Sequence, residues 1–159
     1  MESTIHDLLV GYTEEMATKK QIKRQLRLAD ARLWGIFALY VKYKHSADGV
    51  NVDCFTCGKS IVIGTQNCHA GHWQLKKQFP YHKFNEDNVR PQCARCNLRL
   101  FGDQSMFERN LIDEIGRATV NKIINTREVE FKPDLEWYEE RLEYFGDGIE
   151  QIRTARGWE

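Results

Sequence analysis

The stretch of sequence that decides the fold begins at Cys54-Phe55-Thr56-Cys57 and ends at Cys93-Ala94-Arg95-Cys96. Each Cys-x-x-Cys turn places two thiolates on one side of a tight loop, and two such turns complete a tetrahedron around Zn²⁺. Because four thiolates leave no open position for water, this zinc is expected to be structural rather than catalytic. The sequence therefore predicts a structural zinc site with the ligands Cys54, Cys57, Cys93 and Cys96.

The segment between the two cysteine pairs, residues 58–92, is longer than a minimal zinc ribbon needs, so it must form structure of its own. It contains His72, whose neutral imidazole is suited to act as a general base near pH 7. Asn97, directly after the second pair, offers an amide oxygen to a hard divalent cation such as Mg²⁺ or Mn²⁺. Asn88 can hydrogen-bond to backbone on both sides of a loop and so pin the segment that carries the base. A base and a cation are what phosphodiester hydrolysis requires at neutral pH.

The composition is that of an ordinary water-soluble domain. The chain has 159 residues, of which 42% are hydrophobic and 29% charged, and these values argue against disorder or a fibrous protein. No apolar run approaches the roughly 20 residues needed to span a bilayer, and the start of the chain does not resemble a secretory signal. Five cysteines, four of them committed to metal, favour a reducing cytoplasm over a disulfide framework. The remaining one, Cys68, is expected to be a small buried side chain.

The formal net charge is zero, but the charges are unevenly distributed. Residues 19–44 carry eight basic side chains against one acidic one, and residues 72–101 carry six against two. Residues 103–159 carry eight basic and fourteen acidic side chains. A basic helix next to a basic zinc region predicts a surface that binds the DNA backbone, whereas a solvated lysine-rich face is the simpler alternative. The expected phosphate contacts are Lys23, Arg24, Arg27, Lys76 and Lys77.

Hydrophobic periodicity predicts a mostly helical α+β protein. One or two helices are expected over residues 4–44, ended by Ser46 to Gly49, and further helices over 105–115, 119–125 and from Lys132 or Pro133 onwards. Short extended pieces are expected over 50–63, a strand with His72 over 68–75, a loop over 79–88 that contains His82, and a short helix after Cys93. His82 and His45 are expected to face solvent. These elements divide the chain into an N-terminal helical region (1–46), a zinc-bound core of two strands and a helix (47–103) and a C-terminal helical region (104–159).

The order of these motifs resembles a known nuclease motif. Cys-x-x-Cys, Gly71-His72, Asn88-Val89 and Cys-x-x-Cys-Asn97 resemble the HNH (ββα-metal) nucleases in their zinc-stabilised form. More narrowly, three stretches are similar to the NinG recombination proteins of lambdoid phages: residues 70–73, 84–89 and 92–97. Weaker similarity extends over residues 29–143.

This resemblance implies metal-dependent cleavage of branched DNA during phage recombination, in the cytoplasm of a bacterial host cell. His72 would be the general base, Asn97 a ligand of the catalytic Mg²⁺ or Mn²⁺, and Asn88 the residue that holds the loop. By analogy with endonuclease VII-type junction resolvases, which act as dimers, a homodimer formed through the N-terminal helix is expected.

The chain departs from many HNH proteins at Gly71, because a second metal ligand often stands directly before the histidine. His69 and Asp103 are the candidates to replace it, or the cation is held by Asn97, the phosphate and water. Two other functions remain open: a non-catalytic zinc module that binds DNA, and an HNH nicking or restriction nuclease of another purpose.

Overall fold

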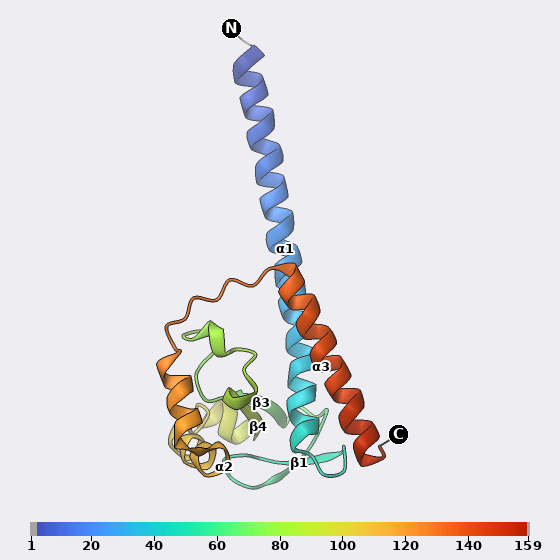
Figure 1. The fold of residues 1–159 in the computed structure, drawn as a ribbon, viewed down its shortest axis with the longest axis vertical. Coiled ribbons are helices and arrows are strands. Elements are labelled where there is room, and N and C mark those ends of the chain that lie inside the picture. Colours follow the sequence, from blue (N-terminus) through green and yellow to red (C-terminus); the bar gives the residue numbers. More distant parts are fainter. Residues whose placement is uncertain (1–2, 159) are drawn as a thin grey trace.

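The structure is a computed structural model that describes residues 3–158, with side chains from Thr18 onwards. Residues 1, 2 and 159, the outer ends of the predicted N- and C-terminal regions, lie outside the described residues. The chain forms a mostly helical α+β fold, as predicted, with two separate two-stranded antiparallel sheets. Its long first helix, α1, projects well beyond the other elements, and the third helix, α3, runs along its C-terminal half (Figure 1).

Helix α1 (Ser3–His45) is continuous across the region where one or two helices were predicted. The helix ends where the side chains of Ser46 and Asp48 accept hydrogen bonds from the backbone that follows. The Ser46 hydroxyl accepts from Gly49 N–H (2.9 Å), and Asp48 Oδ1 accepts from Asn51 N–H (2.6 Å). Gly49 is required at this point, because its φ is 75° and a Cβ there would lie 2.8 Å from the Trp158 ring.

Two short hairpins follow α1 and carry the cysteines. Strands β1 (Asn51–Asp53) and β2 (Ser60–Val62) pair around the first Cys-x-x-Cys turn. Strands β3 (Cys68–His72) and β4 (Val89–Cys93) pair in a register that places Cys68 opposite Cys93 and His72 opposite Val89. The β3–β4 connection contains two 3₁₀ turns, η1 (Pro80–His82) and η2 (Glu86–Asn88). A short π-helix, η3 (Arg95–Arg99), carries Asn97 where a short helix was predicted.

Helix α2 (Gln104–Asn125) contains both helices predicted for residues 105–125. They are separated by a break at Gly116, whose φ of 81° and ψ of 152° are not helical. Helix α3 (Leu135–Arg156) begins at Asp134, whose side chain accepts from Trp137 N–H, and ends at Gly157, whose φ is 66°. The sequence predicted a last helix preceded by Lys132 or Pro133, and α3 begins shortly after Pro133.

Two hydrophobic clusters hold the helices to the β3–β4 hairpin. The first joins α1 and α3 to the hairpin; Phe37 and Phe145 meet edge to face at 4.9 Å, and Val89 of β4 is fully buried beside them. The second joins both halves of α2 to Trp73, which directly follows β3. The hairpin that contains the predicted site is therefore packed between α1 on one side and α2 on the other.

Candidate functional site

The four predicted zinc ligands come together at the point where the two hairpins meet. The Sγ atoms of Cys54, Cys57, Cys93 and Cys96 all lie within 4.8 Å of one another. The Sγ atoms of Cys57 and Cys93 are 3.9 Å apart, and a tetrahedral Zn²⁺ with 2.3 Å bonds to sulfur needs edges of roughly 3.8 Å. The four cysteines are thus placed to bind one metal ion and are compatible with structural zinc.

The thiol environment also suits a metal that binds thiolates. Burial raises the pKa of the Cys54 thiol, but hydrogen bonds from the Thr56 hydroxyl and from backbone N–H groups, including that of Cys93, outweigh it and lower the pKa to about 6. Burial raises the pKa of Cys96 to about 12 and also raises that of Cys57. A bound cation would favour ionisation of these two thiols. Cys68 is buried beside the cluster, as predicted, and is not one of the four.

His72 occupies the last position of β3 and is 8% exposed. Its Nε2 lies 3.0 Å from the backbone oxygen of Lys83, and its ring stacks on Trp34 of α1 with centroids 5.0 Å apart and planes 18° apart. Since a carbonyl oxygen can only accept, Nε2 carries the hydrogen and Nδ1 holds the lone pair of the neutral ring. Burial lowers the pKa of His72 to about 4, with the nearby Lys76 and Lys83 acting in the same direction. The imidazole is therefore neutral at pH 7.

Asn88 pins the β3–β4 connection, which is the loop-holding geometry predicted for it. It is fully buried; its Oδ1 accepts from Gln74 N–H (2.7 Å), and its Nδ2 donates to the carbonyls of Gln74 and His82 (3.0 Å each). These three bonds join both ends of the connection. Losing the amide would leave buried backbone groups unpaired and release the segment that orients His72.

The residue that orients His72 is itself tied to α1 and α3. Lys83 Nζ lies 2.5 Å from Asp30 Oδ2 of α1, and Asp30 Oδ1 accepts from the Tyr138 hydroxyl of α3 at 3.2 Å. Helix α1 thus contacts the imidazole directly through Trp34, and both α1 and α3 help to hold Lys83, whose backbone carbonyl contacts the imidazole. No local sequence pattern relates Trp34 to His72, so this contact could not be predicted from the sequence.

Gly71 has no room for a side chain. A Cβ at this position would clash with Oε1 of Gln92, which lies two residues along β4 from Arg90, the strand partner of Gly71. Gln92 is fully buried; its Nε2 donates to the Gly102 carbonyl (2.8 Å), and its Oε1 has no hydrogen-bond partner among the described residues. The amide of Gln92 therefore fills the space that a side chain at position 71 would need. Sequence reasoning did not single out Gln92.

The remaining predicted site residues are more scattered. Asn97 is half-buried in η3, and no described residue hydrogen-bonds to its side-chain amide. The turn after η3 reaches the backbone of His72, because Gln104 Nε2 lies 3.4 Å from the His72 carbonyl oxygen.

The two candidates for a second metal ligand lie apart from His72. His69 lies on the opposite face of β3 from His72, by strand alternation, and its Nε2 contacts the Gln66 carbonyl at 2.9 Å. Asp103 has a φ of 47° and stands at the N-cap of α2, where its side chain forms no capping bond.

The predicted phosphate contacts are exposed. Lys23, Arg24 and Arg27 lie on α1, and Lys77 lies in the β3–β4 connection. Lys76 places its Nζ 4.5 Å from the centroid of the Trp34 ring, so it lies beside His72.

Other basic and histidine side chains differ from expectation. Arg90, counted with the basic zinc region, is 3% exposed and donates to Glu114 (2.9 Å) and to the Glu86 carbonyl (2.6 Å).

The prediction that His82 and His45 face solvent was wrong. His82 is 1% exposed, and its two ring nitrogens contact Asn85 (3.2 Å) and Thr126 (3.4 Å). His45 is mostly buried near Glu114, and burial lowers its pKa to about 4. Both histidines stand among polar residues in the sequence, which led to the prediction of exposure, but in the fold both lie against α2.

A cleft of about 600 Å³ opens elsewhere, between the β3–β4 connection, α2 and α3. None of the predicted catalytic, metal-binding or DNA-binding residues lines it; its walls include Tyr81, Trp137 and Tyr144.

None of the helices among the described residues has the length and apolar character that a membrane span requires.

Fold and site together define a small α+β protein in which a tetracysteine metal site joins two hairpins and long helices enclose a buried histidine. The family model described as "Bacteriophage Lambda NinG protein" matches residues 13–148, and the chain belongs to this NinG family. It is 30% identical over 73 residues to Protein ninG of Escherichia phage lambda and to Protein ninG of Salmonella phage P22, matches that cover 46% of this chain and 34% of each relative. The chain thus aligns with about a third of the length of these curated relatives. No solved structure matches it.

Proposed function

We propose that the protein is a metal-dependent HNH-type endonuclease that cleaves branched DNA in phage recombination. The observation that carries this proposal is the state of His72: a neutral imidazole in a fixed tautomer, at the end of a strand whose hairpin joins the metal site. Membership of the NinG family supports the recombination setting. The projecting basic stretch of α1 supports a nucleic-acid substrate.

In this mechanism the Nδ1 of His72 accepts a proton from the attacking water. The Lys83 carbonyl holds the ring through Nε2–H, and the Trp34 ring covers one face of the imidazole and limits its rotation. Asn88 keeps the connection that carries Lys83 in place. Lys76, next to Trp34, is positioned to contact a phosphate beside the base.

The groups available as ligands, an asparagine amide oxygen, the phosphate and water, fit a hard divalent cation that keeps many water ligands. The described residues form no second group of three His, Cys, Asp or Glu side chains, so Asn97 would hold Mg²⁺ or Mn²⁺ together with the phosphate and water. Gln92 Oε1, which is buried and has no hydrogen-bond partner among the described residues, is a second amide oxygen; the Nε2 of the same amide donates to Gly102, which follows η3. The cation would stabilise negative charge on the leaving oxygen.

Cleavage of four-way, flap and linear DNA with added Mg²⁺ or Mn²⁺ tests the proposal. His72→Ala and Asn97→Ala are expected to lower the rate by 100-fold or more, on the order of a lost general base or charge-stabilising group. Asn121→Ala, an exposed asparagine on α2, is the matched control and should cleave like the wild type. Zinc content must be unchanged in every variant. If His72→Ala retained the full rate, the proposed mechanism would be wrong.

The filled space at Gly71 favours a second candidate, a zinc module that binds DNA without cutting it. This function requires salt-sensitive DNA binding with no product in any divalent cation. A third, an HNH nicking or restriction nuclease, requires linear duplex to be cut as fast as branched substrates. The same panel separates all three.

A further inference from the structure

The turn between η3 and α2 exposes an aromatic ring in an unusual backbone conformation. Phe101 is 83% exposed and has a φ of 52°, in the left-handed region that bulky L-residues rarely adopt. Gly102 (φ 88°) and Asp103 (φ 47°) continue this conformation. An exposed ring gains nothing from burial, so packing within this chain does not account for a phenylalanine here.

The turn is anchored to both parts of the candidate site. Gly102 N–H donates to the carbonyl of the metal-site residue Cys96 (2.9 Å), and Gln92 Nε2 donates to the Gly102 carbonyl (2.8 Å). Gln104 Nε2 lies 3.4 Å from the His72 carbonyl oxygen. These contacts fix the base of the Phe101 turn relative to the cysteines and to the strand that carries His72.

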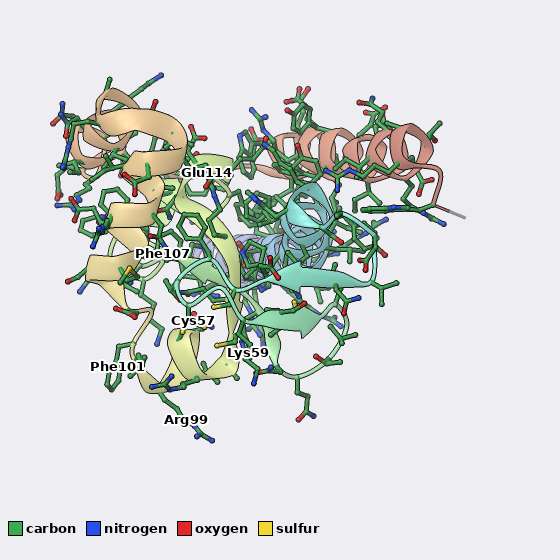
Figure 2. All side chains as sticks on the ribbon, turned by 90° about the horizontal axis from the view of Figure 1, so that it is seen from below. Cys57, Lys59, Arg99, Phe101, Phe107 and Glu114 are labelled. Atoms are coloured by element: carbon green, nitrogen blue, oxygen red, sulfur yellow. The ribbon has the colours of Figure 1, made fainter. Side chains whose placement is uncertain are left out.

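The residues that precede Phe101 in the sequence combine exposed apolar side chains with positive charge. Leu98 and Leu100 are 58% and 42% exposed. Arg95 and Arg99 are exposed, and neither forms an ion pair with any described residue. Figure 2 shows Phe101 and Arg99 pointing away from the molecule at its lower edge, with Cys57 above them in this view. Residues 95–101 carry two basic and no acidic side chains, and the half-buried Asp103 follows in the turn, so the patch is net positive and complementary to a polyanion rather than to a second copy of itself.

We propose that Phe101 stacks on an unpaired base at a DNA branch point while Arg95 and Arg99 contact the flanking phosphates. Aromatic rings beside cations are a general means of binding unstacked bases, and apolar wedges also enter between base steps of opened duplex. The inference rests on the proposed function in taking DNA as the substrate. It adds the feature that is recognised, an unpaired or readily unstacked base next to the cleavage site.

A binding experiment without Mg²⁺ tests this inference independently of cleavage. Zinc-loaded full-length protein is titrated against a four-way junction, a flap with 2-aminopurine at the branch, and linear duplex of equal length. Phe101→Ala is expected to weaken binding to the two branched substrates by roughly tenfold, the scale of losing one base–aromatic stack, and binding to duplex by less than about twofold. Quenching of 2-aminopurine by the wild type should disappear in Phe101→Ala and persist in Phe101→Trp.

The matched control is Val129→Ala, which also shortens an exposed apolar side chain, in the linker before α3, and should change neither affinity. Equal losses on branched and linear DNA, or no loss, would overturn the proposal. So would a Phe101→Ala protein that lost a dimer present in the wild type, because the ring would then be a contact between copies. Phe101-dependent junction binding without any cleavage would instead overturn the proposed nuclease and leave this inference standing.

Discussion

The chemistry of His72 depends on two contacts made by residues distant in sequence. The Lys83 carbonyl fixes which nitrogen carries the hydrogen, and the Trp34 ring removes one face of the imidazole from water. Burial disfavours the charged ring, so the folded pKa of about 4 lies below the ordinary value of 6.5. The stability contributed by the neutral ring is therefore fully present above pH 6.5 and is lost as pH falls towards 4.

Replacing Trp34 by alanine should raise the pKa of His72 towards its ordinary value, because the ring becomes hydrated. Trp34→Phe, which keeps an aromatic cover, should leave the pKa close to that of the wild type. Titration of the imidazole resonances by NMR measures both. An unchanged pKa in Trp34→Ala would mean that the stack does not control the protonation of His72, whatever the protein's activity.

Gly71 and Gln92 form a second pair whose coupling can be measured. Gly71→Ala places a Cβ against Gln92 Oε1 and should destabilise the fold by about 1–3 kcal/mol, the usual scale of overpacking. Shortening the neighbour relieves the clash, so Gly71→Ala should cost much less when it is made in a Gln92→Ala background. Denaturant unfolding of the zinc-loaded wild type, the two single variants and the double variant measures the coupling between the two positions. Additive effects would show that the two side chains do not compete for the same space.

At the scale of elements, local sequence patterns predicted more of the fold than of the site. The cysteine pairs, the stop after α1, the turn at Gly102 and the break within α2 all have local signals, namely metal spacing, polar turn residues and glycine. Contacts between distant segments have none. The stack of Trp34 on His72, the Gln92 amide at Gly71 and the burial of His82 follow from how the helices pack on the hairpin, which periodicity alone does not specify.

The two hairpins should depend on the metal more than the helix pair does. Among the described residues, their shared cluster consists of Val52, Ile61 and four cysteines, with Ile63 packed against it, whereas α1 and α3 share a cluster of large aromatic and aliphatic side chains. The wild type should therefore bind about one zinc per chain, and Cys54→Ser or Cys93→Ser should release it. Hydrogen exchange should then accelerate over β1–β4 while α3 stays protected. Cys68→Ser, the matched control, should keep its zinc.

At the scale of the whole molecule, the N-terminal part of α1 extends away from the packed elements (Figure 1), whereas Lys44 near its C-terminus pairs with Glu86. A helix that projects in this way can follow the phosphate backbone over a longer stretch than the hairpins alone. Such contacts carry no sequence or branch information, because phosphates are present on every DNA shape. The division of labour expected for this protein is affinity from α1 and recognition of the branch from the Phe101 turn.

Replacing Lys23, Arg24 and Arg27 together by glutamine should therefore weaken binding to branched and linear DNA by similar factors. Each lost phosphate contact removes about 0.9 from the slope of log affinity against log salt, so the triple variant should lower that slope by up to about 2.7. The matched control replaces Arg117, Lys122 and Lys132, exposed cations of α2 and the linker, and alters the net charge equally. Equal effects of the two triple variants would indicate an influence of net charge alone. A loss confined to branched DNA would assign recognition to α1 and contradict the separation of roles between the projecting helix and the Phe101 turn.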